Sequence, residues 1–167
     1  MRNPFIVVIV LTCLLFSGVG AQAQEAAGEG SIATCTFEDE KEMSVRYTPP
    51  KSSEKVPNGK IWAPGGKPML LFTQTDIMLG NSPIPVGAYT MYTIPGKSSW
   101  TVIVSKNVDP AAKYDEKQDI ARAQMDIGQL SSEEPQFSVV FGRVGPKKCA
   151  MRFYFGKIGA FVDFDEK

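Results

Sequence analysis

The sequence predicts an all-β fold: an antiparallel β-sandwich, or a jelly-roll-like barrel, of about ten short strands. Short segments in which apolar and polar residues alternate recur along the chain, separated by turn residues at intervals of roughly 8–12 residues. We find no convincing long helical pattern and no internal repeat. Two widely separated cysteines, Cys35 and Cys149, could link the first strand of such a fold to one near its end.

Residues 1–23 have the features of a secretory signal peptide. Arg2 precedes an apolar stretch at 5–19, and Ala21-Gln22-Ala23 fits the small-x-small rule for signal peptidase. A retained membrane anchor is the alternative, but the apolar run is shorter than the roughly 20 residues that a span needs. A lipoprotein is less favoured, because Cys13 lies within the apolar run. We therefore expect export to the periplasm or the extracellular space.

The mature chain would comprise a flexible leader at 24–30 and a single β-sandwich domain at 31–167. Removing residues 1–23 leaves 17 basic against 18 acidic side chains, a net charge of −1. This balance gives no reason to expect nucleic acid or an anionic membrane as a partner. We expect no transmembrane segment in the mature chain, and either an envelope protein or a small ligand as its partner.

Cys35 and Cys149 are the two cysteines of the mature chain. In an exported protein such a pair most simply forms a disulfide. A redox-active pair is the alternative, although the chain has no Cys-x-x-Cys spacing to lower a thiol pKa. The sequence therefore favours a structural bridge.

The first half of the domain reads as strands joined by loops. Segments 34–37 and 43–47 flank a charged turn and predict a hairpin. Segment 48–59 holds three prolines and is predicted to be a loop. Segment 69–79, "MLLFTQTDIML", reads as one strand, and 80–89 as a turn with prolines at a sheet edge.

The second half continues this pattern. The alternating segments "YTMYTI" and "WTVIVS" predict a hairpin around "PGKSS", and a polar crossover follows at 107–119. Segment 120–127 has a composition suited to a helix, but its apolar residues alternate, so we interpret it as a strand. Further strands are predicted at 137–144, 149–155 and 160–164, with turns at 145–148 and 156–159.

The chain contains no histidine. Serine–histidine and cysteine–histidine catalysis, imidazole acid–base chemistry and histidine-ligated metal sites are therefore excluded. Two cysteines are too few for a thiolate metal site. We expect no metal site and no cofactor.

Carboxylate, lysine, serine and tyrosine chemistry remains open. Asp163 and Asp165 share one face of the last predicted strand, while Asp115, Glu116 and Asp119 cluster in the crossover. Paired acids can hydrolyse glycosides when a cleft holds them apart, but acids in these positions are usually solvated surface. The loop lacks the spacing of an EF-hand.

Other residue groups have structural explanations. The "GKSS" segment at 96–99 could hold a serine–lysine dyad, but its residues are ordinary turn residues. A sugar-stacking platform could form from the aromatic side chains, although we expect at least half of them to fill the core. These residues are Trp62, Tyr89, Tyr92, Trp100, Tyr114 and Tyr154.

The segment "PIPVGAYTMYTIPGKSSWTVIVSKN" resembles the uncharacterised bacterial secreted family known as domain of unknown function 2911. The matching residues are Pro85, Gly87, Tyr89, Ile94, Pro95, Gly96, Trp100 to Ile103, Lys106 and Asn107. "YDEKQDIARAQMDI" is similar to the family's Tyr-Asp-Glu-Lys segment, and the early and late cysteines resemble one branch of it. The resemblance covers residues 31–167 and implies an exported all-β domain without assigning a reaction.

The segment around Trp62 departs from the family's pattern. The frame is kept by Val56, Pro57, Gly59, Lys60, Ile61, Trp62 and Gly65. The family's most polar positions are instead occupied by Ala63, Lys67, Pro68, Met69, Leu70 and Leu71. "IWAPGGKPMLLF" also lacks Walker spacing and a following helix, so a phosphate-binding loop is not predicted.

The sequence therefore favours a non-enzymatic envelope module, binding or structural in role. We predict that it binds its partner through a strand-edge surface around Trp62 and Lys67. The competing hypothesis is an envelope hydrolase or lyase that uses carboxylate and tyrosine chemistry. A thiol–disulfide protein is a third, less favoured one.

Overall fold

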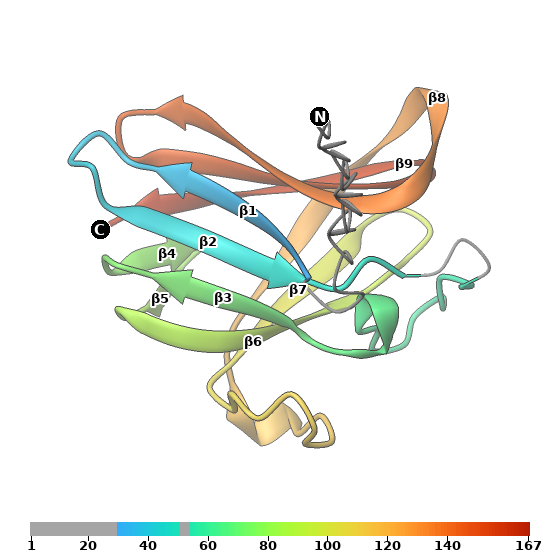
Figure 1. Cartoon of the computed structure of the whole chain (residues 1–167), viewed down its shortest axis with the longest axis horizontal. Helices are drawn as coiled ribbons and strands as arrows, with labels where there is room; N and C mark the ends of the chain where they lie inside the picture. The colour runs from blue at the N-terminus through green and yellow to red at the C-terminus, as the bar shows by residue number, and fades with distance from the viewer. Residues whose placement is uncertain (1–29, 51–53) are drawn as a thin grey trace, which may run out of the picture.

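The fold is all-β, as the sequence predicts (Figure 1). A computed structural model describes residues 30–50 and 54–167; the predicted signal peptide, and all of the predicted leader except Gly30, lie outside these residues. The strands are β1 (Ser31–Thr36), β2 (Glu42–Tyr47), β3 (Met69–Thr73), β4 (Ile77–Leu79), β5 (Ser82–Ile84), β6 (Gly87–Ile94), β7 (Trp100–Ser105), β8 (Asp119–Gly145) and β9 (Lys148–Glu166). Two short 3-10 helices, η1 (Pro64–Gly66) and η2 (Glu116–Gln118), lie in connecting segments.

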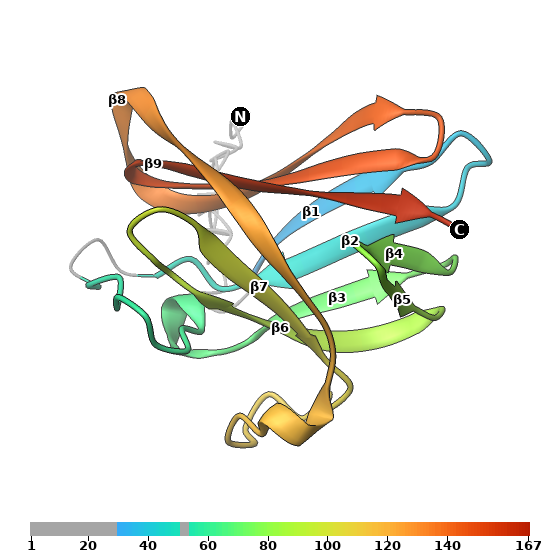
Figure 2. The same cartoon turned by 180° about the vertical axis from the view of Figure 1, so that it is seen from behind.

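The strands follow the order β1-β2-β3-β6-β7-β8-β9-β4-β5, and every pair is antiparallel. β8 belongs to both layers, because residues 119–125 pair with β7 and residues 126–145 pair with β9. Figure 2 shows β8 leaving the crossover that follows β7 and running to the far end of the molecule. We call β1, β2, β3, β6, β7 and the start of β8 the first layer, and the rest of β8 with β9, β4 and β5 the second layer.

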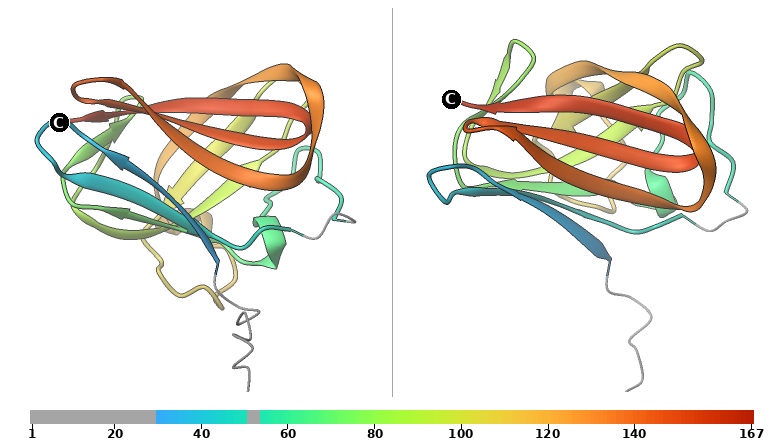
Figure 3. Two further views of the ribbon diagram at one scale, coloured as in Figure 1. Left: turned by 45° about the horizontal axis from the view of Figure 1, so that its top comes forward. Right: turned by 90° about the horizontal axis from the view of Figure 1, so that it is seen from above.

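β9 turns back on itself near Gly156, where φ is 60°. The backbone N–H of Glu166 donates to the carbonyl of Lys147 at 2.7 Å, so the two ends of this 19-residue strand lie together. The halves of β8 pair with different halves of β9, and β8 therefore also reverses, in a wider loop around the inner turn (Figure 3). The turn predicted at 156–159 thus lies inside β9.

Other boundaries differ from the predicted ones. Segment 69–79 is two strands, because Thr73 Oγ1 donates to the Thr75 carbonyl at 2.6 Å and closes a turn that moves the chain from the first layer to the second. β5 forms where only a turn was predicted, and its Pro83 is tolerated because β5 is an edge strand. Residues 30–50 and 54–167 form nine strands, where the sequence predicted about ten.

The core lies between the layers and is dominated by large side chains. Its fully buried members include Trp100, Phe37, Phe137, Phe153, Phe164, Met43, Met69, Leu71, Ile77, Leu79, Ile84 and Met91. The inward residues of β2, Met43, Val45 and Tyr47, alternate with outward polar residues, as the period of a strand requires.

The predicted disulfide is present and closes the sandwich. Cys35 on β1 is bonded to Cys149 on β9, across 114 residues of chain. Both side chains are buried among core residues. Nearby, the N–H of Glu38 donates to the Pro146 carbonyl at 3.0 Å, so the bridge fastens the edge of the first layer to the β8–β9 turn.

Candidate functional site

Trp62 is a core residue, with 5% of its surface exposed. Its ring packs edge-on against Trp100 and Phe137, at centroid distances of 5.8 and 5.6 Å. Its indole Nε1–H donates to Glu54 Oε1 at 2.7 Å, which satisfies the polar end of the ring. No face of this ring is open for a ligand to stack on in this conformation.

Lys67 follows a tight turn and is exposed. The turn depends on Gly65, which has a φ of 71° and whose missing Cβ would lie 2.4 Å from the Thr48 carbonyl oxygen. The "PGG" sequence is therefore explained by close backbone packing. A binding role for Trp62 and Lys67 stays a prediction, and only Lys67 is accessible here.

The two acids predicted to share a face of the last strand do so. Lys148 Nζ lies 3.2 Å from Asp165 Oδ1 and 3.8 Å from Asp163 Oδ2. The hydrogen bond to Asp165, followed by the charges of both acids, raises the pKa of the Lys148 ammonium. Asp126 joins Asp163 and Asp165 in lining a shallow hollow on the outer surface of the second layer.

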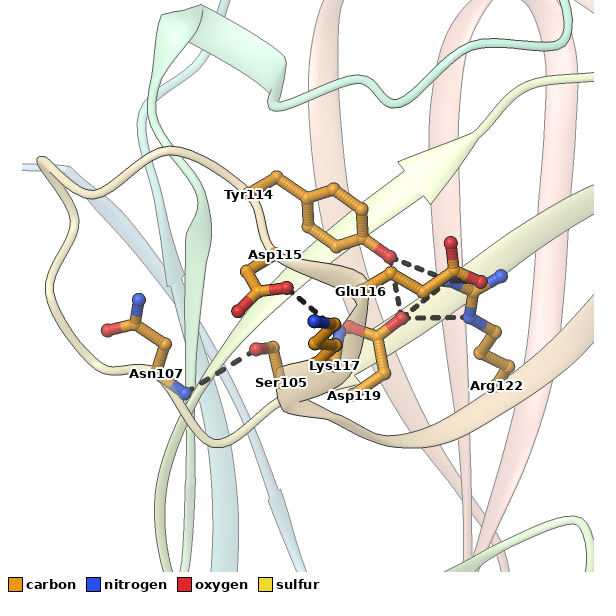
Figure 4. Close-up of polar contacts among 8 residues, drawn as sticks. All are labelled: Ser105, Asn107, Tyr114, Asp115, Glu116, Lys117, Asp119 and Arg122. Atoms are coloured by element: carbon orange, nitrogen blue, oxygen red, sulfur yellow. Dashed lines mark hydrogen bonds and ion pairs between the residues drawn. The ribbon is translucent and has the colours of Figure 1, made fainter.

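The acids of the crossover form a second polar group, drawn in Figure 4. Asp119 Oδ2 accepts hydrogen bonds from the Tyr114 hydroxyl at 2.6 Å and from Arg122 Nε at 2.8 Å. Glu116 adds an ion pair to Arg122 at 3.0 Å. The Asp119 side chain is 8% exposed, and its Oδ1 has no hydrogen-bond partner among the described residues.

This crossover network fastens the 106–118 segment onto the outer face of the first layer. The ring of Tyr114 packs against Tyr92 on β6, with centroids 5.0 Å apart. Burial, and then the hydrogen bond to Asp119, raise the pKa of the Tyr114 hydroxyl. Tyr114, Glu116, Asp119 and Arg122 thus each have a partner within the network. We interpret the network as an anchor for the crossover.

Tyr114→Phe should weaken this anchor and change how stability depends on pH. Because the pKa of the Tyr114 hydroxyl is higher in the folded than in the unfolded protein, the protonated hydroxyl stabilises the fold fully below the unfolded tyrosine pKa of about 10. This contribution to stability is lost as pH rises from that value towards the folded pKa. We expect the variant to lose about 1–3 kcal/mol at pH 7, because the Tyr114 hydroxyl makes two hydrogen bonds: it donates to Asp119 Oδ2 at 2.6 Å and accepts from Arg122 Nη2 at 2.7 Å. Urea unfolding of both proteins at pH 7 and pH 10.5 measures this. The difference in free energy of unfolding between the two proteins should be smaller at pH 10.5 than at pH 7. An equal difference at the two pH values would contradict the assignment.

A hollow that sequence reasoning missed lies on the outer face of the second layer, where β8 meets the later half of β9. Its volume is about 240 Å³. The residues that line it are Gly128, Gln129, Leu130, Arg152, Tyr154, Gly159, Ala160 and Phe161. Figure 3 shows this part of the sheet, where the nested reversals of β8 and β9 lie side by side. We call it the β8–β9 hollow.

The hollow exists because two glycines face each other across neighbouring strands. Gly128 is the register partner of Gly159. A Cβ on Gly159 would lie 3.2 Å from Leu130 Cδ2 and 3.4 Å from Tyr154 Cε1, so these side chains cover that glycine. A Cβ on Gly128 would meet nothing within 4 Å, so Gly128 forms an open floor.

Phe161 and Arg152 give the lining of the hollow an exposed aromatic side chain and an exposed cation. Phe161 is 44% exposed and Val140, the register partner of Arg152, is 45% exposed. Arg152 is the only charged residue among those that line the hollow. Phe161 also lines the shallow hollow of Asp126, Asp163 and Asp165, so its ring separates a cationic site from an acidic one.

Half of the aromatic residues considered for a sugar-stacking platform are buried, as the sequence predicts. Three of the six considered for a sugar-stacking platform, Trp62, Tyr92 and Trp100, are buried. Tyr89, Tyr114 and Tyr154 are partly exposed. Only Tyr154 among the six lines the β8–β9 hollow. The glycines at 128 and 159 are the sequence signal for this site, but their meaning depends on a register that the sequence does not reveal.

The family model described as "Protein of unknown function (DUF2911)" matches residues 31–164. The chain belongs to this family. No curated protein and no solved structure matches the chain. The matched DUF2911 region spans the disulfide, the crossover network and the β8–β9 hollow, so all three lie within the family's domain.

The residues that resemble the DUF2911 pattern have structural roles. The Tyr89 hydroxyl donates to the Pro85 carbonyl at 2.9 Å, and a Cβ on Gly96 would lie 2.5 Å from the Ser99 carbonyl oxygen. Thr90 Oγ1 donates to the Asn107 carbonyl at 2.6 Å, which ties the crossover to β6. The motif thus describes how this hairpin folds, and it names no reaction.

Proposed function

We propose that this protein is an exported, non-enzymatic domain of the cell envelope that binds a small ligand in the β8–β9 hollow. The observation that carries the proposal is the open glycine floor bordered by Tyr154, Phe161 and Leu130. Concave sites with an apolar wall and a few polar groups are the usual places for small-molecule binding. The volume of about 240 Å³ suits one ring of a ligand better than a large cofactor.

Two features support export. The sequence predicts a signal peptide at 1–23, and disulfides persist in oxidising compartments such as the periplasm or the extracellular space. The Cys35–Cys149 bond fits such a compartment. Across residues 30–50 and 54–167, no helix has the length and apolar character to span a membrane.

Binding is favoured over catalysis by the chemistry of the lining. The side chains that line the β8–β9 hollow can stack on a ligand, pack against it or hydrogen-bond to it. The carboxylates of Asp126, Asp163 and Asp165 line the neighbouring hollow, on the far side of Phe161. Glycoside hydrolysis needs one carboxyl group that carries a proton and one that is ionised. Asp163 and Asp165 are instead both engaged by one cation, Lys148, at 3.8 and 3.2 Å. The carboxylate hydrolase remains the second candidate, because three aspartates line one hollow.

Gly128→Leu tests the binding proposal by filling the floor. Gly128 has open space above it and an ordinary φ, so the change should not strain the fold. The matched control is Gly142→Leu, because Gly142 is on the same strand, is equally open and does not line the hollow. Isothermal titration with a mixture of neutral and acidic oligosaccharides provides the readout.

We expect Gly128→Leu to weaken binding at least tenfold, because the leucine would occupy the space of the ligand. Gly142→Leu should bind as the unmodified protein does. Circular dichroism and urea unfolding should show both variants folded. Equal affinity in the two variants would contradict the proposal, and hydrolysis of the probes that is lost in Asp126→Asn would favour the second candidate.

A further inference from the structure

Arg152 is an exposed cation at the edge of an apolar hollow. The ion pairs of residues 30–50 and 54–167 involve Lys41, Arg122 and Lys148, and none involves Arg152. Its guanidinium therefore keeps its hydrogen-bonding capacity free. A planar guanidinium beside an aromatic surface suits a carboxylate, which it can bind through two parallel hydrogen bonds.

The strand register fixes where Arg152 stands. Arg152 pairs with Val140 on one side, and the reversal of β9 brings it beside Phe161 on the other. Tyr154 is two residues further on, so its ring faces the same surface as the arginine. A ligand on the floor at Gly128 would thus meet two aromatic rings and one cation.

We propose that the β8–β9 hollow takes a six-membered sugar ring that carries a carboxylate, a hexuronic acid unit of an oligosaccharide. This inference rests on the proposed binding function and specifies its ligand. The C–H face of the sugar ring packs on Tyr154 and Phe161, and the carboxylate binds the Arg152 guanidinium.

The surrounding charges favour a ligand with one carboxylate on each sugar ring over a ligand with closely spaced sulfates or phosphates. Asp126, Asp163 and Asp165 line the neighbouring hollow, across the ring of Phe161 from Arg152. A ligand with closely spaced sulfates or phosphates would bring like charges near these acids, and their repulsion would weaken binding. A ligand with one carboxylate on each ring, one of them bound at Arg152, experiences less of that repulsion.

The test compares oligogalacturonic acid with the same oligosaccharide after reduction of its carboxyl groups. Binding is measured by isothermal titration for the unmodified protein and for Arg152→Gln, Arg152→Lys, Gly128→Leu and Arg143→Gln. Arg143 is the matched control, since it is an exposed arginine of β8 outside the hollow. Circular dichroism confirms that each variant is folded.

We expect the acidic probe to bind at least tenfold more tightly than the reduced probe, and added salt to narrow this difference. Arg152→Gln should remove the preference, Arg152→Lys should keep part of it, and Arg143→Gln should keep all of it. Gly128→Leu should bind neither probe. Equal binding of the two probes by the unmodified protein, or a preference that survives Arg152→Gln, would overturn the inference.

The two proposals fail in different ways. If the unmodified protein binds both probes equally well and Gly128→Leu binds neither, the hollow is a ligand site and only the carboxylate preference is wrong. If neither probe binds, the hexuronic acid assignment is overturned, and the ligand mixture then tests the hollow independently.

Discussion

Replacing both Cys35 and Cys149 with alanine is expected to lower the free energy of unfolding by about 2–4 kcal/mol. The bond closes a loop across 114 residues, which restricts the unfolded chain strongly, and it joins β1 to β9 where the two layers meet. Both sulfurs lie in the core, so the double substitution removes a cross-link and leaves no buried unpaired thiol. Urea unfolding at neutral pH measures the change.

The reduced form of the unmodified protein provides the control for this prediction. If the loss comes from the missing covalent link, reduction of the disulfide should destabilise the protein by an amount similar to the double alanine substitution. A double variant as stable as the oxidised protein would show that the layers hold together without the bridge. Ellman titration of the unmodified protein should find no free thiol in the mature chain.

Trp62→Ala is expected to lower the free energy of unfolding by about 3–5 kcal/mol, because it removes a large side chain from the centre of the core. The ring contacts Trp100, Phe137 and Phe155, so the cavity would open between the layers. Lys67→Ala should change stability by less than about 0.5 kcal/mol, because Lys67 is exposed. Urea unfolding and near-ultraviolet circular dichroism measure both effects.

Trp62→Phe separates the two contributions of this residue. It keeps an aromatic ring in the core but removes the hydrogen bond to Glu54 Oε1, which also accepts from the Gly65 N–H at 3.3 Å. We expect a smaller loss than for alanine. If Trp62→Ala were fully stable and bound the probes less tightly, the core assignment would be wrong and the predicted binding role would be favoured.

Local pattern predicted most of the fold. The β1–β2 and β6–β7 hairpins follow directly from period-two alternation around turn residues. The disulfide was predicted from the expected compartment and from the number of cysteines outside the predicted signal peptide. These features depend on residues close in sequence or on simple chemical arguments.

Features that depend on long-range register were not predictable in this way. Segment 69–79 reads as one strand in the sequence, but hydrogen bonds between the Thr73 side chain and the Thr75 backbone close a turn that divides it between the layers. The strands predicted at 120–127 and 137–144 became one continuous β8, whose reversal is set by its pairing with β9. Tertiary pairing decided these boundaries.

The candidate site also depends on long-range register and was not predicted from local pattern. The sequence directed attention to Trp62, since tryptophan beside a glycine-rich turn suggests a binding surface, but the isolated bridge between Trp62 and Thr93 brings the indole into the core. Gly128 and Gly159 lie 31 positions apart and are unremarkable in the sequence. They form a floor only because the two strands pair at those residues.

Backbone amide NMR during titration with oligogalacturonic acid tests the central claim most directly. If the β8–β9 hollow is the binding site, the amide signals that shift should be those of its lining, with Gly128, Tyr154, Gly159 and Phe161 among the largest. Signals near Lys67 should stay in place. Shifts centred on Lys67, with those of the hollow unchanged, would contradict the account.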